Sequence, residues 1–147
     1  MDSTDWTILE ALQEDARIGY AELGRRVGLS APTVTERVRR LEDEGVITGY
    51  HAAVNPAALG MELPVFIRMN VGNKEYAKFR EIVKNMPRIL ECHHLTGESA
   101  FLLRAQVESV GALETLIGRL SVYGQTSTSL VLSTVLPRRV IGPQVSK

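Results

Sequence analysis

The sequence has a single cysteine and no long apolar run, and these two features exclude proteins stabilised by an internal disulfide and proteins with a membrane-spanning helix. Cys92 stands alone among the 147 residues, so a disulfide within the chain is excluded and a reducing compartment is favoured. No stretch approaches the roughly 18 apolar residues that a membrane-spanning helix requires. The first residues are acidic and amphipathic, without the basic start and apolar core of a secretion signal. We therefore expect a cytoplasmic protein without a membrane partner.

The chain also lacks net charge, because 17 basic residues balance 17 acidic ones. The balance is uneven along the chain. Residues 1–60 carry ten acidic and six basic side chains, a net of −4, and residues 61–147 carry seven acidic and eleven basic, a net of +4. Five of the six basic residues in the first part fall at positions 25–26 and 37–40. A local basic face is possible there, but a broadly basic surface is excluded.

Three helices are expected in the first part of the chain. Apolar residues recur at helical spacing through Thr4–Leu12, and Ser3 or Thr4 stands where a side chain can cap this helix. A second helix is predicted at about 20–27 and a third at about 30–44, ending at a glycine. Residues 46–54 then favour an extended segment, and the Asn-Pro and Leu-Gly pairs of residues 55–60 favour a turn.

The connection between the second and third helices has the composition of a helix-turn-helix. Gly28 stands where a helix ends in a left-handed residue, and Ser30 is a strong N-cap for the next helix. Gly24, four residues earlier, leaves room where two helices cross closely. This spacing is that of DNA-binding helix-turn-helix proteins. An ordinary three-helix bundle with solvated arginines is the alternative interpretation.

Two kinds of DNA contact are expected from these helices. The N-terminal part of a recognition helix meets base edges, so Ala31, Thr33, Glu36 and Arg37 are the candidate readers. Arginine pairs with guanine and glutamate accepts from cytosine, whereas the remaining arginines suit phosphates. The candidate DNA-binding residues are Arg25, Arg26, Ser30, Ala31, Pro32, Thr33, Glu36, Arg37, Arg39 and Arg40.

The second part predicts a ferredoxin-like βαββαβ domain, which makes the whole chain an α+β protein. Helices on one face of its sheet would leave the other face open, and a dimer that closes two sheets on each other would bury it. We expect two domains: residues 1–60, a helix-turn-helix of the winged type with a linker strand, and residues 61–147. The elements expected in the second domain are strands at 63–71, 89–95, 101–107 and 126–136, a helix from Tyr76 to before Pro87, and a helix that closes near Gly124.

An ordered set of residues resembles the Lrp/AsnC family of transcriptional regulators, also called feast/famine regulators. The resemblance covers nearly the whole chain. One departure is Gly19, where the family often has a serine that caps the second helix. The matching positions are Asp5-x-x-Ile8-Leu9, Asp15-Ala16-Arg17, Glu22-Leu23, Val27-Gly28-Leu29-Ser30, Arg37-Val38-Arg39-Arg40-Leu41-Glu42, Gly45-Val46-Ile47, Tyr50, Asn55-Pro56, Leu59-Gly60, Cys92-His93-His94-Leu95-Thr96-Gly97, Leu102-Leu103 and Tyr123-Gly124-Gln125-Thr126-x-Thr128-Ser129.

The resemblance implies that the second domain dimerises, that dimers gather into tetramers or octamers, and that an amino acid binds in clefts between dimers. A second position departs from the family: Ala100 stands where an aspartate is usual, although Glu98 is near in sequence. An altered amino acid, another effector class and no effector all remain open. The candidate effector-binding residues are Thr96, Gly97, Glu98, Ser99, Ala100, Thr126, Ser127 and Thr128.

The sequence favours no catalytic residue, metal site or cofactor. His93 and His94 alternate along a strand and therefore face opposite sides, and no second ligand pair stands at zinc-site spacing. The expected function is a sequence-specific DNA-binding transcriptional regulator with double-stranded DNA, a second copy of itself and a small-molecule effector as partners. A nucleoid-organising DNA-binding protein without an effector is one alternative. Another is a small-molecule-binding or enzymatic α+β domain whose N-terminal helices only mediate assembly.

Overall fold

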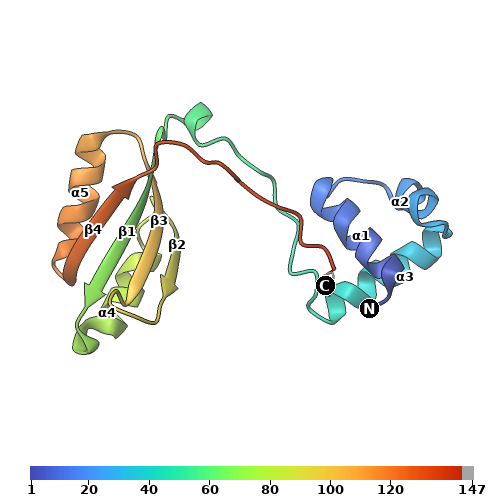
Figure 1. Cartoon of the computed structure of the whole chain (residues 1–147), viewed down its shortest axis with the longest axis horizontal. Coiled ribbons are helices and arrows are strands. Elements are labelled where there is room, and N and C mark those ends of the chain that lie inside the picture. The colour runs from blue at the N-terminus through green and yellow to red at the C-terminus, as the bar shows by residue number, and fades with distance from the viewer. Residues whose placement is uncertain (144–147) are drawn as a thin grey trace. The chain divides into compact units, whose positions relative to one another are not determined.

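The computed structural model describes residues 1–143, which form two compact units (Figure 1). Unit 1 consists of Met1–Ala53 and the described residues from Leu136 onward, and unit 2 consists of Val54–Val135. The sequence placed the whole of 61–147 in the second domain, whereas the end of the described chain lies with the first unit. Two hydrogen bonds between the Gln13 side-chain amide and the Ile141 backbone, 2.9 and 3.0 Å long, hold it there.

Unit 1 is built on three helices, α1 (Ser3–Glu14), α2 (Tyr20–Val27) and α3 (Ala31–Asp43). Their inner faces bury one apolar cluster, and the partly buried side chains of Trp6 and Leu29 pack against it. The helix-turn-helix expected from the glycine and serine spacing is therefore present. The buried cluster consists of Ile8, Leu9, Ala11, Leu12, Ile18, Leu23, Val34, Val38 and Leu41.

The first helix is capped one residue earlier than expected. The Asp2 carboxylate, and not Ser3 or Thr4, accepts a hydrogen bond of 2.8 Å from the backbone N–H of Asp5. The Asp5 carboxylate in turn accepts from the backbone N–H of Asp2 at 2.9 Å. This reciprocal capping box satisfies two N–H groups at once, which a single hydroxyl cannot do.

The turn between α2 and α3 follows the local chemistry of its residues. Gly28 is left-handed at φ 70°, and the hydroxyl of Ser30 accepts from the backbone N–H of Thr33 at 3.4 Å. Gly24 is required for a different reason than expected: a Cβ there would lie 2.5 Å from the backbone oxygen of Leu29. The closest approach is thus to the turn, and the backbone nitrogen of Ala31, the first residue of α3, lies 3.6 Å from the same Cβ position.

The segment after α3 differs from the expected linker strand. Gly45 ends the helix at φ 71°, and the N–H groups of Val46 and Ile47 both donate to the carbonyl of Leu41. Residues 46–54 pair with no strand in the described chain, so this unit carries no β-hairpin wing. Further on, the turn expected at residues 55–60 contains a short 3₁₀ helix, η1 (Ala57–Leu59).

Unit 2 has the predicted βαββαβ order, with a second 3₁₀ turn, η2, before its first helix. Its four strands form one antiparallel sheet in the order β2-β3-β1-β4. The chain connectivity is visible in Figure 1. The elements are β1 (Leu63–Val71), η2 (Asn73–Glu75), α4 (Tyr76–Lys84), β2 (Ile89–His94), β3 (Phe101–Val107), α5 (Val110–Ser121) and β4 (Gly124–Leu130).

The sheet has one face covered by helices and one that is not. On the covered face the alternate residues of β1, such as Ile67, are buried with Phe79 of α4 and Leu116 of α5. The other alternate residues form what we call the open face, with Phe66 39% exposed near its centre. The open face consists of Phe66, Arg68 and Asn70 of β1, Glu91 and His93 of β2, Leu102 and Arg104 of β3, and Gln125, Ser127 and Ser129 of β4.

The last strand is shorter than the predicted 126–136. It begins earlier, at Gly124, and its final ladder pair joins Leu130 to Val65. One more hydrogen bond follows, from the N–H of Val131 to the carbonyl of Pro64. Because β1 begins at Leu63, which the register would set opposite residue 132, a β4 that ran to 136 would have no strand beside its last residues. Residues 132–136 therefore continue past the end of the sheet without strand pairing.

Candidate DNA-binding face and effector-binding site

The outer side of α3 carries most of the predicted DNA-binding residues. Five of them line one shallow hollow together with Asp43, while Val34, Val38 and Leu41 lie buried on the inner side. Ala31 and Pro32 lie in the first turn of the same helix, after the Ser30 cap. The five that the structure brings together are Thr33, Glu36, Arg37, Arg39 and Arg40.

Two of these arginines are joined to carboxylates at the start of α1, Asp2 of its N-cap and Asp5 of its first turn, and sequence reasoning missed these contacts. The Nη1 atom of Arg37 lies 2.7 Å from Asp2 Oδ2 and 2.8 Å from Asp5 Oδ1. The Nη2 atom of Arg40 lies 2.8 Å from both oxygens of Asp5. The two-residue gap between Asp2 and Asp5 is a recognisable capping-box spacing, but no sequence signal connects either carboxylate to arginines about 35 positions away.

The two carboxylates of this network are buried to very different extents. Asp5 is 1% exposed, whereas the side chain of Asp2 is 52% exposed and that of Arg37 is 25% exposed. Burial alone would raise the pKa of Asp5, but the N–H of Asp2 and the guanidinium groups outweigh it and lower that pKa. The N–H of Asp5 and the side chain of Arg37 likewise lower the pKa of Asp2. Both carboxylates are therefore ionised at neutral pH.

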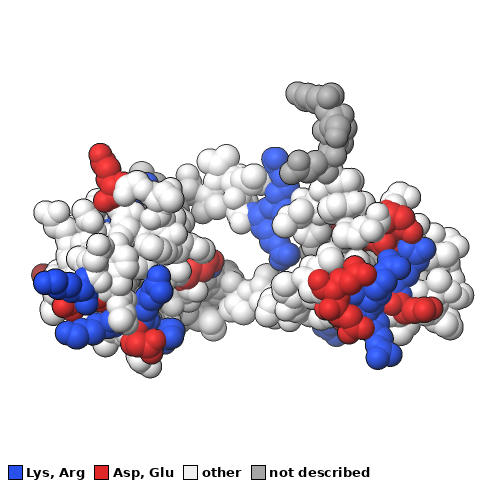
Figure 2. Space-filling view, turned by 90° about the horizontal axis from the view of Figure 1, so that it is seen from below, with Lys and Arg blue, Asp and Glu red and all other residues white. Residues whose placement is uncertain are grey.

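The remaining arginines of the helix-turn-helix are paired at the surface. Arg25 and Arg26 both contact Glu22 one helical turn away, and Arg39 lies 3.8 Å from Asp43. The Arg39 side chain is 80% exposed, and such a loose exposed pair contributes little. Figure 2 shows basic and acidic side chains interleaved on the face of unit 1 that it presents. The local basic face that the sequence allowed is thus interrupted by acids.

The predicted effector loop joins β2 to β3. Its ends are closed by a 2.8 Å hydrogen bond from the N–H of Leu95 to the carbonyl of Ala100, and Gly97 turns the chain at φ 103°. Ala100 is 8% exposed, whereas Glu98 is exposed and makes no hydrogen bond or ion pair with the residues that the structure describes. The loop therefore offers one outward carboxylate, at position 98.

The register of the sheet relates this loop to the predicted residues of β4. Phe101, which follows the loop, pairs with Met69, and Met69 pairs with Thr126. The loop and the start of β4 thus lie at the same end of the sheet, but β1 separates them by two strand spacings, about 10 Å. Thr126 and Thr128 are on the helix-covered side, whereas Ser127 is on the open face. One chain does not bring all eight residues to a single point.

Aromatic rings fix the base of the loop. The ring of His94 stacks on Phe101 with centroids 4.8 Å apart, and Tyr76 meets both rings edge-on. His93 lies on the opposite face, where its Nε2 atom is 3.2 Å from a carboxylate oxygen of Glu91. The two histidines face opposite sides, as their alternation predicted. The described residues contain no group of three or more His, Cys, Asp or Glu able to hold a metal ion.

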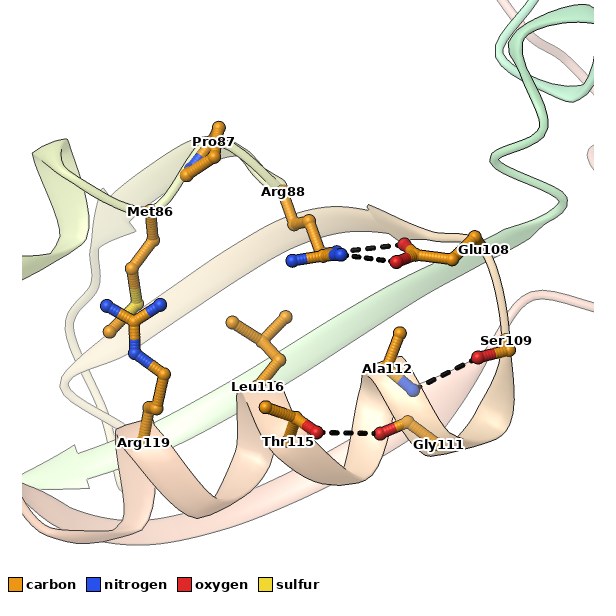
Figure 3. Close-up of a pocket in the computed structure, with 10 residues that line it drawn as sticks. All are labelled: Met86, Pro87, Arg88, Glu108, Ser109, Gly111, Ala112, Thr115, Leu116 and Arg119. Carbon is orange, nitrogen blue, oxygen red and sulfur yellow. Dashed lines mark hydrogen bonds and ion pairs between the residues drawn. The ribbon is translucent and has the colours of Figure 1, made fainter.

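A hollow of about 320 Å³ lies between α5 and the start of β2 (Figure 3). Leu116 and Met86 supply apolar walls, and Arg119 stands at one end. At the other end Arg88 forms a two-point ion pair with Glu108, whose pKa is lowered to about 2 chiefly by that contact. This hollow has no predicted effector residue in its lining, so sequence reasoning and cavity shape point to different places.

Two protein families match the two parts of the chain. The AsnC-type helix-turn-helix domain matches residues 1–42, which contain α1, α2 and nearly all of α3. The Lrp/AsnC ligand binding domain matches residues 64–141, which contain the whole sheet of unit 2 except its first residue. No helix of residues 1–143 is long and apolar enough to cross a membrane.

Whole-length relatives agree with these matches. The HTH-type transcriptional regulator LrpC of Bacillus subtilis is 36% identical over 92% of this chain and 94% of its own, and its solved structure superposes with a TM-score of 0.90 over 94% and 99%. The Leucine-responsive regulatory protein of Escherichia coli is 39% identical over 92% and 87%. A transcriptional regulator of Neisseria meningitidis solved with L-Met is 31% identical, with a TM-score of 0.90 over 96% of both chains. With two matching domains in the family's order and these relatives along its length, the chain belongs to the Lrp/AsnC family of transcriptional regulators.

Proposed function

We propose that this DNA-binding regulator reads its operator with Glu36 and Arg37, and that it holds the DNA backbone with Arg25, Arg26 and Arg39. The supporting observation is that the outer side of α3 gathers Glu36, Arg37 and Arg39 along one hollow. A helix entering the major groove presents its first turns to base edges and its later side chains to phosphates. Ser30, Ala31, Pro32 and Thr33 form the end of α3 that enters the groove.

Arg40 has another role in this proposal. It was expected to bind phosphate, but its guanidinium donates hydrogen bonds to both oxygens of the buried Asp5. Removing it would take the cation that binds both oxygens of Asp5 and weaken the fold as well as the DNA contact, so it is a poor test of DNA binding. Arg37 bonds only one oxygen of Asp5, and thermal melting of Arg37→Ala verifies that this variant keeps its fold. Arg39 is 80% exposed and belongs to no buried network, which makes it the clean test of a phosphate contact.

The experiment compares three proteins on a duplex selected by the parent from a random pool and on an unselected duplex. Arg37→Ala should lower affinity for the selected duplex by about fivefold or more, because a lost base contact costs about 1–3 kcal/mol. Arg39→Ala should weaken both duplexes alike and reduce the salt slope by about 1. Equal loss on both duplexes with Arg37→Ala would refute its role as a reader. Equal parental affinity for both duplexes would favour the nucleoid-organising alternative.

The second half of the proposal is that two copies pair through their open faces. Phe66 is 39% exposed at the centre of that face, and Leu102 lies near it. Arg104 and Glu91 form an ion pair beside these apolar groups, with nitrogen and oxygen 2.6 Å apart. An apolar centre within a polar margin is the usual composition of a protein interface, and a twofold dimer would cover both copies at once.

The effector is proposed to be an amino acid held at the end of the sheet between copies of the chain. In support, Thr96–Ala100 and the start of β4 lie at the same end of the sheet yet are separated by β1, so a second chain would be needed to complete one enclosure. Glu98 is the carboxylate available to an ammonium group, since Ala100 offers none. Leucine and methionine are the first ligands to try, because one relative is named for its response to leucine and another was solved with L-Met.

Thermal unfolding against the twenty amino acids at millimolar concentration tests this proposal. A ligand present at about 100 times its dissociation constant stabilises the folded state by about 2.7 kcal/mol, which is readily seen in a chain of this size. A shift that Glu98→Gln and Ser99→Ala both reduce would support the loop as the site. A shift that survives both changes would place the ligand elsewhere. No shift with any amino acid would leave another effector class or none.

A further inference from the structure

The Arg37 guanidinium is held between a buried carboxylate and an exposed one. Asp5 is 1% exposed, accepts from Arg37 and Arg40, and is fixed by the N–H of Asp2. Asp2 lies at the surface with a 52% exposed side chain, and its Oδ2 atom is 2.7 Å from the same Nη1 atom of Arg37. The two carboxylates therefore have different roles: the buried Asp5 orients the guanidinium, and the exposed Asp2 pairs with it on the solvent side.

A carboxylate in this position offers an arginine the same interaction that a DNA phosphate would. Both are anions with two oxygens able to accept from a guanidinium. A phosphate or base that binds Arg37 through its Nη1 atom must therefore take one hydrogen bond of that atom from Asp2, and the Asp2 charge beside the guanidinium repels the DNA backbone. Asp5 is not open to this exchange, because it is buried and its oxygens are shared with Arg40.

We infer that Asp2 is an intramolecular competitor that occupies Arg37 until DNA displaces it, and that it thereby lowers the affinity of each helix-turn-helix for DNA. The inference rests on the proposed role of Arg37 as a DNA contact. It assigns Asp2 a function beyond helix capping: a single helix-turn-helix binds weakly, and stable binding then depends on several copies engaging one duplex. Arg37 makes no ion pair in the described chain other than those with Asp2 and Asp5.

Capping and competition can be separated by one substitution. Asparagine is as good an N-cap as aspartate, and its side-chain oxygen can still accept from the N–H of Asp5. Asp2→Asn therefore keeps α1 capped and removes only the Asp2 charge beside Arg37, while Asp5 stays in place. Glu14→Gln is the matched control, since it removes one exposed negative charge from the same helix at a residue that pairs with no cation of the described chain.

The experiment measures binding of the full chain to the selected duplex, where Arg37 is proposed to make its contact, between about 50 and 200 mM salt, a range over which the loss of phosphate contacts is readily measured. Asp2→Asn should bind up to about fivefold more tightly per helix-turn-helix, the range that an exposed ion pair spans. The slope of log affinity against log salt should steepen by about 0.9 for each additional phosphate that the protein neutralises. Glu14→Gln should show a smaller increase in affinity and an unchanged slope.

Two further variants complete the cycle. In Asp2→Asn/Arg37→Ala the increase should disappear, because the competitor then has nothing to occupy. An increase that persists in this double variant, or that Glu14→Gln matches, would overturn the inference and leave a general charge effect. If Arg37→Ala alone leaves binding to both selected and unselected duplexes unchanged, the proposed role of Arg37 as a DNA contact is refuted, independently of the role inferred for Asp2. Circular dichroism melting of each variant verifies that the folded state is retained.

Discussion

The Nη2 atom of Arg40 lies 2.8 Å from both carboxylate oxygens of Asp5, a residue that is only 1% exposed. This pair joins the first turn of α1 to the last turns of α3, so the two ends of the three-helix unit are held by charge as well as by apolar packing. A buried carboxylate is tolerated only when its oxygens are fully bonded. Asp5 meets this condition through Arg37, Arg40 and the N–H of Asp2.

Asp5→Asn should destabilise unit 1 by about 2–3 kcal/mol, somewhat below the range for breaking a fully buried ion pair, because Arg40 is half exposed. Trp6 is the only tryptophan of the chain and packs against the core of unit 1, so its fluorescence during urea unfolding reports this unit. Glu14→Gln provides the control for a lost surface charge. A midpoint for Asp5→Asn equal to that of the control would mean that the network adds nothing to stability.

Acid should weaken the same unit through the same carboxylate. Hydrogen bonds and arginines lower the pKa of Asp5 in the folded chain, against an unfolded value of about 3.9. A lowered folded pKa contributes stability that is fully present above the unfolded value and is lost as the pH falls through the folded one. The Trp6 unfolding midpoint of the parent should therefore decline below about pH 4 more steeply than that of Asp5→Asn. Parallel curves for the two proteins would contradict this assignment.

The features that sequence reasoning placed correctly are those decided within a few residues. The left-handed Gly28 and the Ser30 cap follow from local preferences, and α2 has the predicted bounds. Apart from the Asp2 cap of α1, which is local, the features that it missed depend on partners far along the chain. Where β4 ends is decided by where β1 begins, and Arg37 is held by a carboxylate 35 positions away. Apolar periodicity and capping rules carry no information about such pairs.

Gly24→Ala should destabilise unit 1 although alanine is the better helix former. The new Cβ would lie 2.5 Å from the backbone oxygen of Leu29, so the turn leading to α3 must move. The clash should outweigh the helix propensity advantage of about 1 kcal/mol. Gly19→Ser is the matched contrast: nothing lies within 4 Å of a Cβ there, and α2 has no side-chain cap. That change should stabilise by about 0.5–1 kcal/mol. Urea unfolding followed by Trp6 fluorescence compares the stability of the three proteins. An unfolding midpoint for Gly24→Ala equal to or above that of the parent would refute the argument about the turn.

Phe66→Lys should convert the proposed dimer into a monomer without unfolding unit 2. Phe66 belongs to β1 but faces away from the buried cluster that contains Ile67, so its replacement leaves the packing of α4 and α5 intact. Two copies paired through their open faces would bring two lysines together near the twofold axis, and both desolvation and repulsion would oppose pairing. Light scattering coupled to size-exclusion chromatography measures the mass directly.

Arg68→Gln is the control for this change, because it alters a charged residue of the same face while leaving the apolar centre in place. It should retain the parental mass. A parental mass for Phe66→Lys, with an unchanged melting temperature, would show that copies pair through another surface. In that case the effector test becomes the better guide to assembly, because a ligand held between copies should also shift the measured mass.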